Sequence, residues 1–350
     1  MERWLFQSFF VAVNLIIFEG DFTMLSREKL ENNQVLVYIC TLVIAVGFGL
    51  PAPNISSMLD VTISVVIGLL MYSMFSQIPF MSLKDSLSNR RFMIALCIVN
   101  YIAVPIVVWL LALFLPDYSP LLLGVYLVLL TPCIDYVIVF TALGRGNEKA
   151  MLIATPILFI TQMLLLPIYL WLFIGEEASK LIEVTPFVEA FLGLIVLPLG
   201  VAIGIQLLAK KKKFGNQLLE ISAWLPVPFM ALTLFVVVAS QINKLTDSVE
   251  WIVTVIPLYI AFMVIMPFIS KLIGKWMKLD VKTGRALIFS GSTRNSLVVL
   301  PFALALPSEV STIVAAIIVT QTIVEIIGEL LYIRLIPNVV LLDWHRYHIF

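Results

Sequence analysis

The chain has 350 residues, of which 61% are hydrophobic and only 13% are charged, and its formal net charge is zero. Soluble domains are roughly half apolar and about a quarter charged, so this composition excludes an ordinary soluble fold and indicates a polytopic membrane protein. The three cysteines, Cys40, Cys97 and Cys133, lie far apart in apolar stretches, which argues against a disulfide framework or a CxxC metal motif.

Residues 1–33 form an N-terminal segment that we expect to lie at the membrane interface. The apolar stretch 4–18 is 15 residues long, whereas about 20 residues are needed to span a bilayer. The stretch contains Asn14, and no small-residue cleavage pattern of a signal peptide follows it. An alternative interpretation is that Met24 is the native start.

Apolar stretches separated by short polar loops predict ten membrane-spanning helices over the rest of the chain. The expected ranges are 34–51, 58–79, 92–115, 121–142, 151–174, 187–209, 222–239, 251–274, 285–306 and 309–335.

The distribution of lysine and arginine predicts the orientation of these helices, because cytoplasmic loops carry the excess of both. The loops on the opposite side contain only Lys180 and Lys244. The loops on the first side contain fourteen such residues: Lys84, Arg90, Arg91, Arg145, Lys149, Lys210, Lys211, Lys212, Lys213, Lys271, Lys275, Lys278, Lys282 and Arg285. We therefore expect a multi-pass protein of the cell membrane with both termini in the cytoplasm.

Ten spans divide into two groups of five, over residues 34–174 and 175–335, followed by a cytoplasmic tail at 336–350. Because each group has an odd number of spans, the second is inverted relative to the first. The fourth and ninth spans are interrupted at 131–135 and 291–296 by polar residues with Pro or Gly. Matching interruptions in two inverted halves are typical of secondary transporters, whose substrate site lies near the membrane midplane. We therefore predict an all-α fold in which two discontinuous helices cross, the alternative being two ordinary kinks.

Ionisable side chains within membrane spans are costly and often functional. The clearest are Asp135, Arg294, Glu325 and Glu329. A guanidinium stays charged and needs an anionic partner or ligand, for which Asp135 and Glu325 are the candidates. Either a fixed ion pair holds the crossing together, or binding of substrate or a proton displaces that pair.

Uncharged polar groups also gather near the interruptions. Thr293, Asn295 and Ser296 supply hydroxyl and amide groups that could bind a small polar solute. Thr155 and Gln162 lie about two turns apart on the fifth span, and they either contact the ligand or form hydrogen bonds between helices. Cys133 is the soft ligand at an interruption, which would favour a thiophilic solute, unless it is a small core residue.

Four stretches resemble the bile acid:sodium symporter superfamily and its arsenite-efflux branch over residues 34–335. They are Ile-Gly-Leu-Leu-Met-Tyr-Ser-Met-Phe at 67–75, Leu-Gly-Arg-Gly-Asn at 143–147, Cys133-Ile134 followed by Val-Ile-Val-Phe at 137–140, and Arg294-Asn295-Ser296. The resemblance implies a core domain with crossed fourth and ninth helices, packed on a panel of spans one, two, six and seven. It also implies alternating access without ATP hydrolysis and nominates Cys133 for binding As(III).

The sequence departs from this family in the ninth span. The glutamate of the arsenite branch falls at Leu297, the glutamate of the sodium symporters falls near Ser290, and Arg294 stands where those symporters contact sodium. A guanidinium can replace a bound cation, which argues against sodium coupling at that site. Proton coupling through Asp135 or Glu325 is the more natural expectation.

The leading hypothesis is a secondary active transporter that exports arsenite or a related metalloid, coupled to protons. The alternative is a sodium- or proton-coupled transporter of an organic anion, bile acid-like or another carboxylate, which Arg294 would suit. The spans lack the motifs of a membrane enzyme, such as HExxH or a nucleophile elbow, and we expect neither cofactor nor nucleic-acid partner. The expected substrate-binding residues are Cys133, Asp135, Thr293, Arg294, Asn295 and Ser296, and the expected ion-coupling residues are Asp135, Glu325, Thr155 and Gln162.

Overall fold

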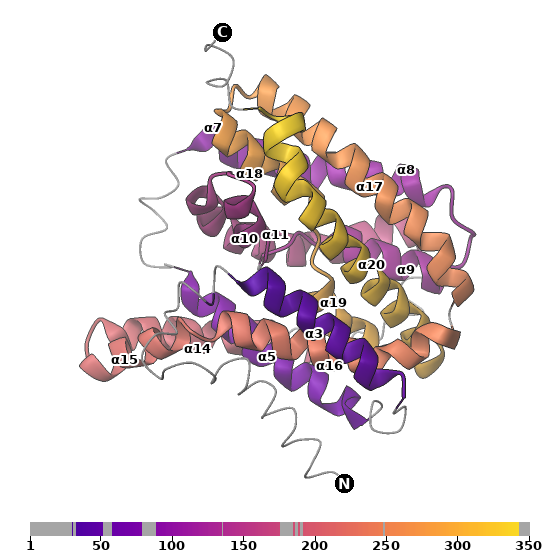
Figure 1. Cartoon of the computed structure of the whole chain (residues 1–350), viewed down its shortest axis with the longest axis horizontal. Coiled ribbons are helices and arrows are strands. Elements are labelled where there is room, and N and C mark those ends of the chain that lie inside the picture. The colour runs from indigo at the N-terminus through magenta and orange to yellow at the C-terminus, as the bar shows by residue number, and fades with distance from the viewer. Residues whose placement is uncertain are drawn as a thin grey trace.

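The computed structural model describes residues 30, 33–51, 58–78, 89–134, 136–175, 185, 188–189, 192–247 and 249–342. Within these ranges every regular element is a helix and no strand is formed, in agreement with the all-α prediction (Figure 1). The predicted interfacial segment at 1–33 lies almost wholly outside the described residues. Asp135 and residues 343–350 of the predicted tail lie outside them as well.

The helices follow one another with short connections. The first half contains α3 (Gln34–Gly49), α5 (Asp60–Gln77), α7 (Arg90–Ile98), the π-helical turn η2 (Val99–Ala103), α8 (Val104–Ala112), α9 (Ser119–Leu129), α10 (Tyr136–Leu143) and α11 (Glu148–Ile174). The second half contains η3 (Leu192–Val196), α14 (Leu197–Ala209), α15 (Lys213–Ser222), α16 (Pro226–Asp247), α17 (Val249–Trp276), α18 (Val281–Ser292), α19 (Ser296–Leu304), α20 (Ser308–Leu335) and η4 (Ile336–Val340).

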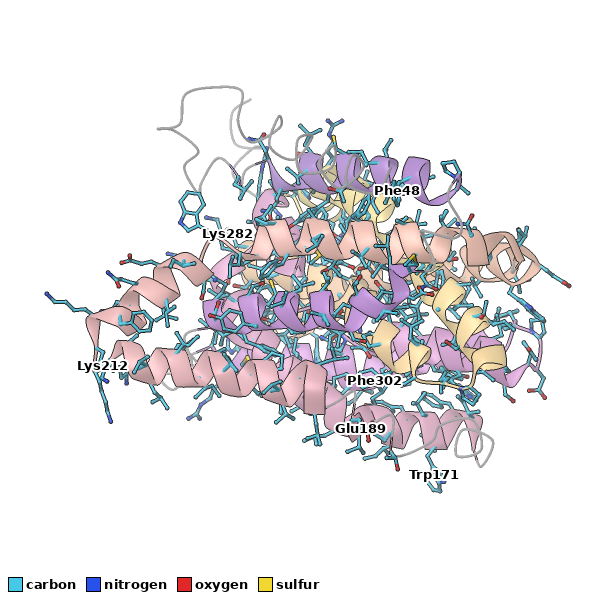
Figure 2. All side chains as sticks on the ribbon, turned by 90° about the horizontal axis from the view of Figure 1, so that it is seen from below. Phe48, Trp171, Glu189, Lys212, Lys282 and Phe302 are labelled. Atoms are coloured by element: carbon cyan, nitrogen blue, oxygen red, sulfur yellow. The ribbon has the colours of Figure 1, made fainter. Side chains whose placement is uncertain are left out.

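Within the described ranges, six helices are long and apolar enough to cross a membrane, and the two parts of α11, bent by 50°, make a seventh if they count as one span. The six are 60–77, 90–112, 192–209, 226–243, 249–276 and 310–340. Large apolar side chains on their outer surfaces are exposed, as expected where lipid replaces water. In Figure 2, Trp171 of α11 points away from the body of the molecule, and it is 64% exposed. The chain is thus a multi-pass membrane protein.

The amphipathic helix α15 was not predicted. The residues at 210–221 were interpreted as a cytoplasmic loop because of the lysines at 210–213. Instead the chain turns back after α14, and Gly215 lies so close to α14 that an added Cβ would come within 2.3 Å of the Ala209 nitrogen. Lys212 lies at the far tip of this α14–α15 hairpin (Figure 2). The missing Cβ of Gly215 is what allows this close packing.

Two groups of helices pack mainly among themselves. One group, called the panel here, consists of α3, α5, α14 and α16, with α15 attached to it. The other, called the core here, contains α7 to α11 and α17 to α20. Figure 1 shows α3, α5, α14 and α16 along one side and α17, α18 and α20 across the other. The two groups meet where α16 contacts α20 and where α5 contacts α19.

The packing of α18 within the core predicts the effect of one substitution. An added Cβ at Gly291 would lie 2.4 Å from Ser270 Oγ and 2.6 Å from Val99 Cγ1, both on neighbouring buried residues. We expect Gly291→Ala to lower the free energy of unfolding by about 1–3 kcal/mol, the usual cost of overpacking. The matched control is Gly200→Ala in α14, where nothing lies within 4 Å. Equal thermal unfolding midpoints of the two variants in detergent would contradict this packing.

Candidate functional site

The two interrupted helices meet at their interruptions. Between α9 and α10 the chain is irregular at 130–134, and between α18 and α19 it is extended at Thr293. Pro132 and Arg294 form an antiparallel bridge. The Cys133 nitrogen donates to the Thr293 carbonyl at 3.3 Å, and the Asn295 nitrogen donates to the Thr131 carbonyl at 2.8 Å. Each interruption therefore supplies the hydrogen-bond partners that the other lacks, as buried backbone at membrane depth requires.

Side chains complete the ends of the broken helices. Asn295 caps α19, because its Oδ1 accepts a hydrogen bond from the Val298 nitrogen at 3.1 Å. Gln162 of α11 donates through Nε2 to the Leu130 carbonyl at the end of α9. Gln162 is thus part of the crossing, whereas the Thr155 hydroxyl donates to the Leu152 carbonyl of its own helix, at 3.5 Å. Of the two polar residues predicted on the fifth span, the structure brings one to the crossing.

Arg294 is fully buried, and its guanidinium does not form the predicted ion pair with Glu325. Its Nη2 donates to Asn100 Oδ1 at 2.9 Å and to the Ser290 carbonyl at 2.6 Å, and Nη1 lies 3.5 Å from the Leu129 carbonyl. The guanidinium carbon lies 5.7 Å from the centre of the Phe262 ring. Nε has no partner.

Of the two candidate partners, Glu325 therefore does not pair with the guanidinium in this structure, and the reason is physical. Carbonyls freed by the helix interruption, together with one amide and one aromatic face, can solvate a guanidinium without a carboxylate. The other predicted partner, Asp135, lies outside the described residues. Asn100 was missed by sequence reasoning, and the local signal for it is the π-helical turn η2 in which it lies, since such turns are frequent at functional sites.

Glu325 accepts hydrogen bonds on both carboxylate oxygens. The Tyr136 hydroxyl donates to Oε1 at 2.6 Å, the Arg294 backbone nitrogen donates to Oε2 at 2.8 Å, and Gln321 Nε2 donates to the same Oε2. Glu325 thus holds α20 against both interrupted helices. Tyr136 and Gln321 were not predicted as site residues. Gln321 could have been found, because it lies one turn before Glu325 on the same helix face.

The remaining predicted residues line the crossing. Cys133 is 1% exposed, and its side chain lies close enough to the Arg294 guanidinium for an electrostatic interaction. Ser296 accepts a hydrogen bond from the Thr322 hydroxyl of α20 at 2.7 Å. The Thr293 hydroxyl lies 2.6 Å from Oε1 of Glu329, also on α20. The crossing therefore combines one thiol, one guanidinium and two carboxylates in a buried environment.

A small cavity of about 10 Å³ lies between the panel and the core, next to the crossing. Its lining is aromatic and aliphatic and comes from both groups of helices: Tyr38, Tyr136, Phe140, Met230, Leu234 and Ile326. Tyr136 is part of both the cavity and the crossing, because its ring lines the cavity while its hydroxyl donates to Glu325. Among the described residues no group of three His, Cys, Asp or Glu side chains could hold a metal ion.

The start of α18 is fixed outside the apolar region. The Asp280 carboxylate accepts a hydrogen bond from the Thr283 nitrogen at 3.0 Å and so caps the helix. Partial burial alone would raise the pKa of Asp280, but the hydrogen bonds from Thr283 and Lys282 outweigh it and hold the pKa below its usual value.

The three hydrogen bonds to Glu325 predict the effect of an isosteric change. In Glu325→Gln an NH₂ group replaces one acceptor oxygen. Opposite the Arg294 nitrogen and Gln321 it leaves two buried donors without their acceptor, and opposite Tyr136 it forces the hydroxyl to donate to the Arg294 carbonyl at 3.2 Å instead. In both orientations the hydrogen bonds to a charged acceptor are lost. We expect the free energy of unfolding to fall by about 1–3 kcal/mol. Glu148→Gln at the exposed start of α11 is the control, with an expected change within about 0.5 kcal/mol. Unfolding in detergent micelles measures both, and equal stability of the two variants would contradict the contacts described.

The sequence is similar to that of known membrane transport proteins. Over 297 residues the chain is 26% identical to the arsenical-resistance protein Acr3 of Corynebacterium glutamicum. The matched region covers 80% of this chain and 78% of that protein. The family described as the Sodium Bile acid symporter family matches residues 64–248, just over half of the chain, from α5 to the end of α16. The chain belongs to the sodium bile acid symporter family.

Proposed function

We propose that the protein is a secondary active transporter that exports arsenite or a related metalloid by alternating access, in exchange for protons. The observation that carries this proposal is the place of Cys133. Its thiol is buried at the crossing, on one interrupted helix, and its backbone nitrogen is bonded to the Thr293 carbonyl of the other. A sulfur ligand selects thiophilic solutes such as As(III) over hard ones. The similarity to an arsenical-resistance protein supports the same substrate.

The helix order supports a topology of ten spans in two inverted repeats. If α9 with α10 and α18 with α19 each form one interrupted span, and if α3 also crosses, the interrupted spans are the fourth and the ninth. They then hold the same place in each half, as expected for inverted repeats that build a site at the midplane. Separate packing of panel and core supports alternating access, because two bodies can then move relative to one another. The lysine and arginine distribution favours cytoplasmic termini and the cell membrane.

The charges at the crossing favour protons over sodium as the coupling ion. Arg294 brings a permanent positive charge to the side of the crossing where Asn100 and the Ser290 carbonyl offer oxygen ligands. A cation bound to the same oxygens would be repelled by the guanidinium. Glu325, and Asp135 if it faces the same site, are carboxylates that can exchange protons instead.

The decisive experiment is arsenite efflux from cells that express single-cysteine substitutions. We expect Cys133→Ser to lower efflux by at least roughly tenfold. Loss of a residue that only supports a metal ligand commonly lowers affinity by that factor, and Cys133 is proposed to be the ligand itself. The controls are Cys40→Ser and Cys97→Ser, which remove exposed thiols away from the crossing and should export at the wild-type rate. The arsenite proposal would be refuted if cells that express the wild-type protein, correctly inserted in the membrane, accumulate as much As(III) as cells without it.

A second candidate substrate is an organic anion, favoured by the buried guanidinium of Arg294 at the crossing. A guanidinium suits a carboxylate, which it can bind through two hydrogen bonds. For this substrate we expect Arg294→Gln to abolish carboxylate flux into proteoliposomes and Cys133→Ser to preserve it. The opposite pattern, or the absence of carboxylate flux in the wild type, would exclude this candidate.

A further inference from the structure

Glu329 is a buried carboxyl group that has no role in the transport mechanism proposed above. It lies on α20 one turn beyond Glu325, and none of its surface is exposed. Its Oε1 contacts the Thr293 hydroxyl at 2.6 Å, while its Oε2 has no partner. Within the described part of the chain, no lysine or arginine nitrogen lies at ion-pair distance from it. An ionised carboxylate in this place would be a buried charge without a counter-ion, which is strongly unfavourable.

The hydrogen atoms around Thr293 can be counted. Its Oγ1 lies 2.6 Å from Glu329 Oε1 and 2.7 Å from the Phe289 carbonyl oxygen, four residues earlier. A hydroxyl has one hydrogen to donate, and a carbonyl oxygen has none. If Thr293 donated to an ionised Glu329, its oxygen would face the Phe289 oxygen at 2.7 Å with no hydrogen between them. Threonine in a helix commonly donates to the carbonyl four residues earlier, and the second contact then needs a hydrogen from Glu329.

A protonated Glu329 satisfies every contact in this chain of groups. Its O–H on Oε1 donates to Thr293 Oγ1, and the Thr293 O–H donates to the Phe289 carbonyl. Glu325 has different surroundings. Its Oε2 accepts from two nitrogen donors, the Arg294 backbone and Gln321 Nε2, and its Oε1 lies 2.6 Å from the Tyr136 hydroxyl, whose single hydrogen is also within reach of the Arg294 carbonyl at 3.2 Å. The two nitrogen donors favour a carboxylate oxygen at Oε2 of Glu325, whereas Oε2 of Glu329 has no partner among the described residues.

The groups that face Glu329 favour the neutral form. On its own helix these are Glu325 and the Tyr332 hydroxyl, both of which interact electrostatically with it. The interrupted segment contributes Thr293 and also Arg294, whose guanidinium extends toward Asn100. From α17, the Met263 side chain packs against Gly328 and its carbonyl accepts a hydrogen bond from the Tyr332 hydroxyl, so this contact brings no charged group to Glu329. A negative neighbour and an apolar wall both disfavour a second negative charge.

We propose that Glu329 holds a proton in this conformation and that this proton is exchanged during transport, at a coupling site additional to Glu325. Thr293 stands between α18 and α19, where the helix is interrupted, so a shift of α20 against this segment within the core breaks the Glu329–Thr293 contact. Water that enters then solvates the carboxylate, and the proton leaves Oε1 for that water. The coupling role rests on the transport function proposed above, whereas the protonated state does not.

Infrared spectroscopy of the purified full-length protein tests the protonated state without any transport. The wild type should show the carbonyl band of a buried carboxylic acid that persists at neutral pH and exchanges slowly with D₂O. Glu329→Gln should remove this band, while Glu325→Gln should leave it in place. Persistence of the band in Glu329→Gln, or its loss in Glu325→Gln alone, would overturn the assignment.

A second variant keeps the test decisive if Glu329→Gln does not fold. Thr293→Val removes the hydroxyl but preserves the shape of the side chain and the Glu329 carboxyl itself. Because the acid then loses its hydrogen-bond acceptor, the band should move to higher wavenumber. A band that neither moves nor broadens would show that the acid is not the neighbour of Thr293.

Arsenite movement in proteoliposomes tests the coupling role separately. An imposed proton gradient should accelerate export by the wild type and by Glu148→Gln, an exposed control on α11, but should not accelerate export by Glu329→Gln. Gradient-driven export that persists in Glu329→Gln would overturn the role in coupling. If the wild type moves no arsenite, the coupling role fails together with the proposed function, and the infrared result still decides where the proton is.

Discussion

The arrangement of this protein depends on one constraint: polar backbone groups at membrane depth must find partners within the protein. Two helices are interrupted in the apolar interior, and each interruption exposes N–H and carbonyl groups that lipid cannot satisfy. The Cys133 nitrogen, the Thr131 carbonyl and the corresponding groups of Thr293 and Asn295 pair with each other instead. Because each segment needs the other, the crossing forms as a unit, and the side chains on it are brought together by the same hydrogen bonds.

The charged residues obey the same constraint. The Arg294 guanidinium is accommodated by carbonyl oxygens, an amide and an aromatic ring, while the Arg294 backbone nitrogen is held by Glu325. One residue thus contacts oxygen acceptors through both its side chain and its main chain, in different directions. The positive charge is thus near enough to Glu325 to interact with it electrostatically, but the guanidinium does not contact the carboxylate.

The sequence was most informative where a local signal was strong. Pro132 and the polar run around Arg294 were enough to predict both interruptions, and their matching order predicted that they meet. The partners of the charged groups could not be predicted in the same way, because Asn100 and Tyr136 come from other segments, 194 and 189 positions from the residues that they contact. The expected pairing of Arg294 with Glu325 came from assuming that a buried charge requires an opposite charge. Gln162 could be recognised as polar and buried, but only the packing of α11 shows that it reaches the Leu130 carbonyl rather than a ligand.

Tyr136 joins two parts of the molecule that are chemically different. Its ring forms part of the apolar cavity between panel and core, and its hydroxyl is a ligand of the Glu325 carboxylate. A movement of the panel against the core that turns this ring must also change the hydrogen bonding of Glu325, and the free energy of that change acts equally in both directions. The packing of panel on core at Tyr136 and the state of the buried carboxylate are therefore thermodynamically linked through a single side chain, without any need for a longer chain of contacts between them.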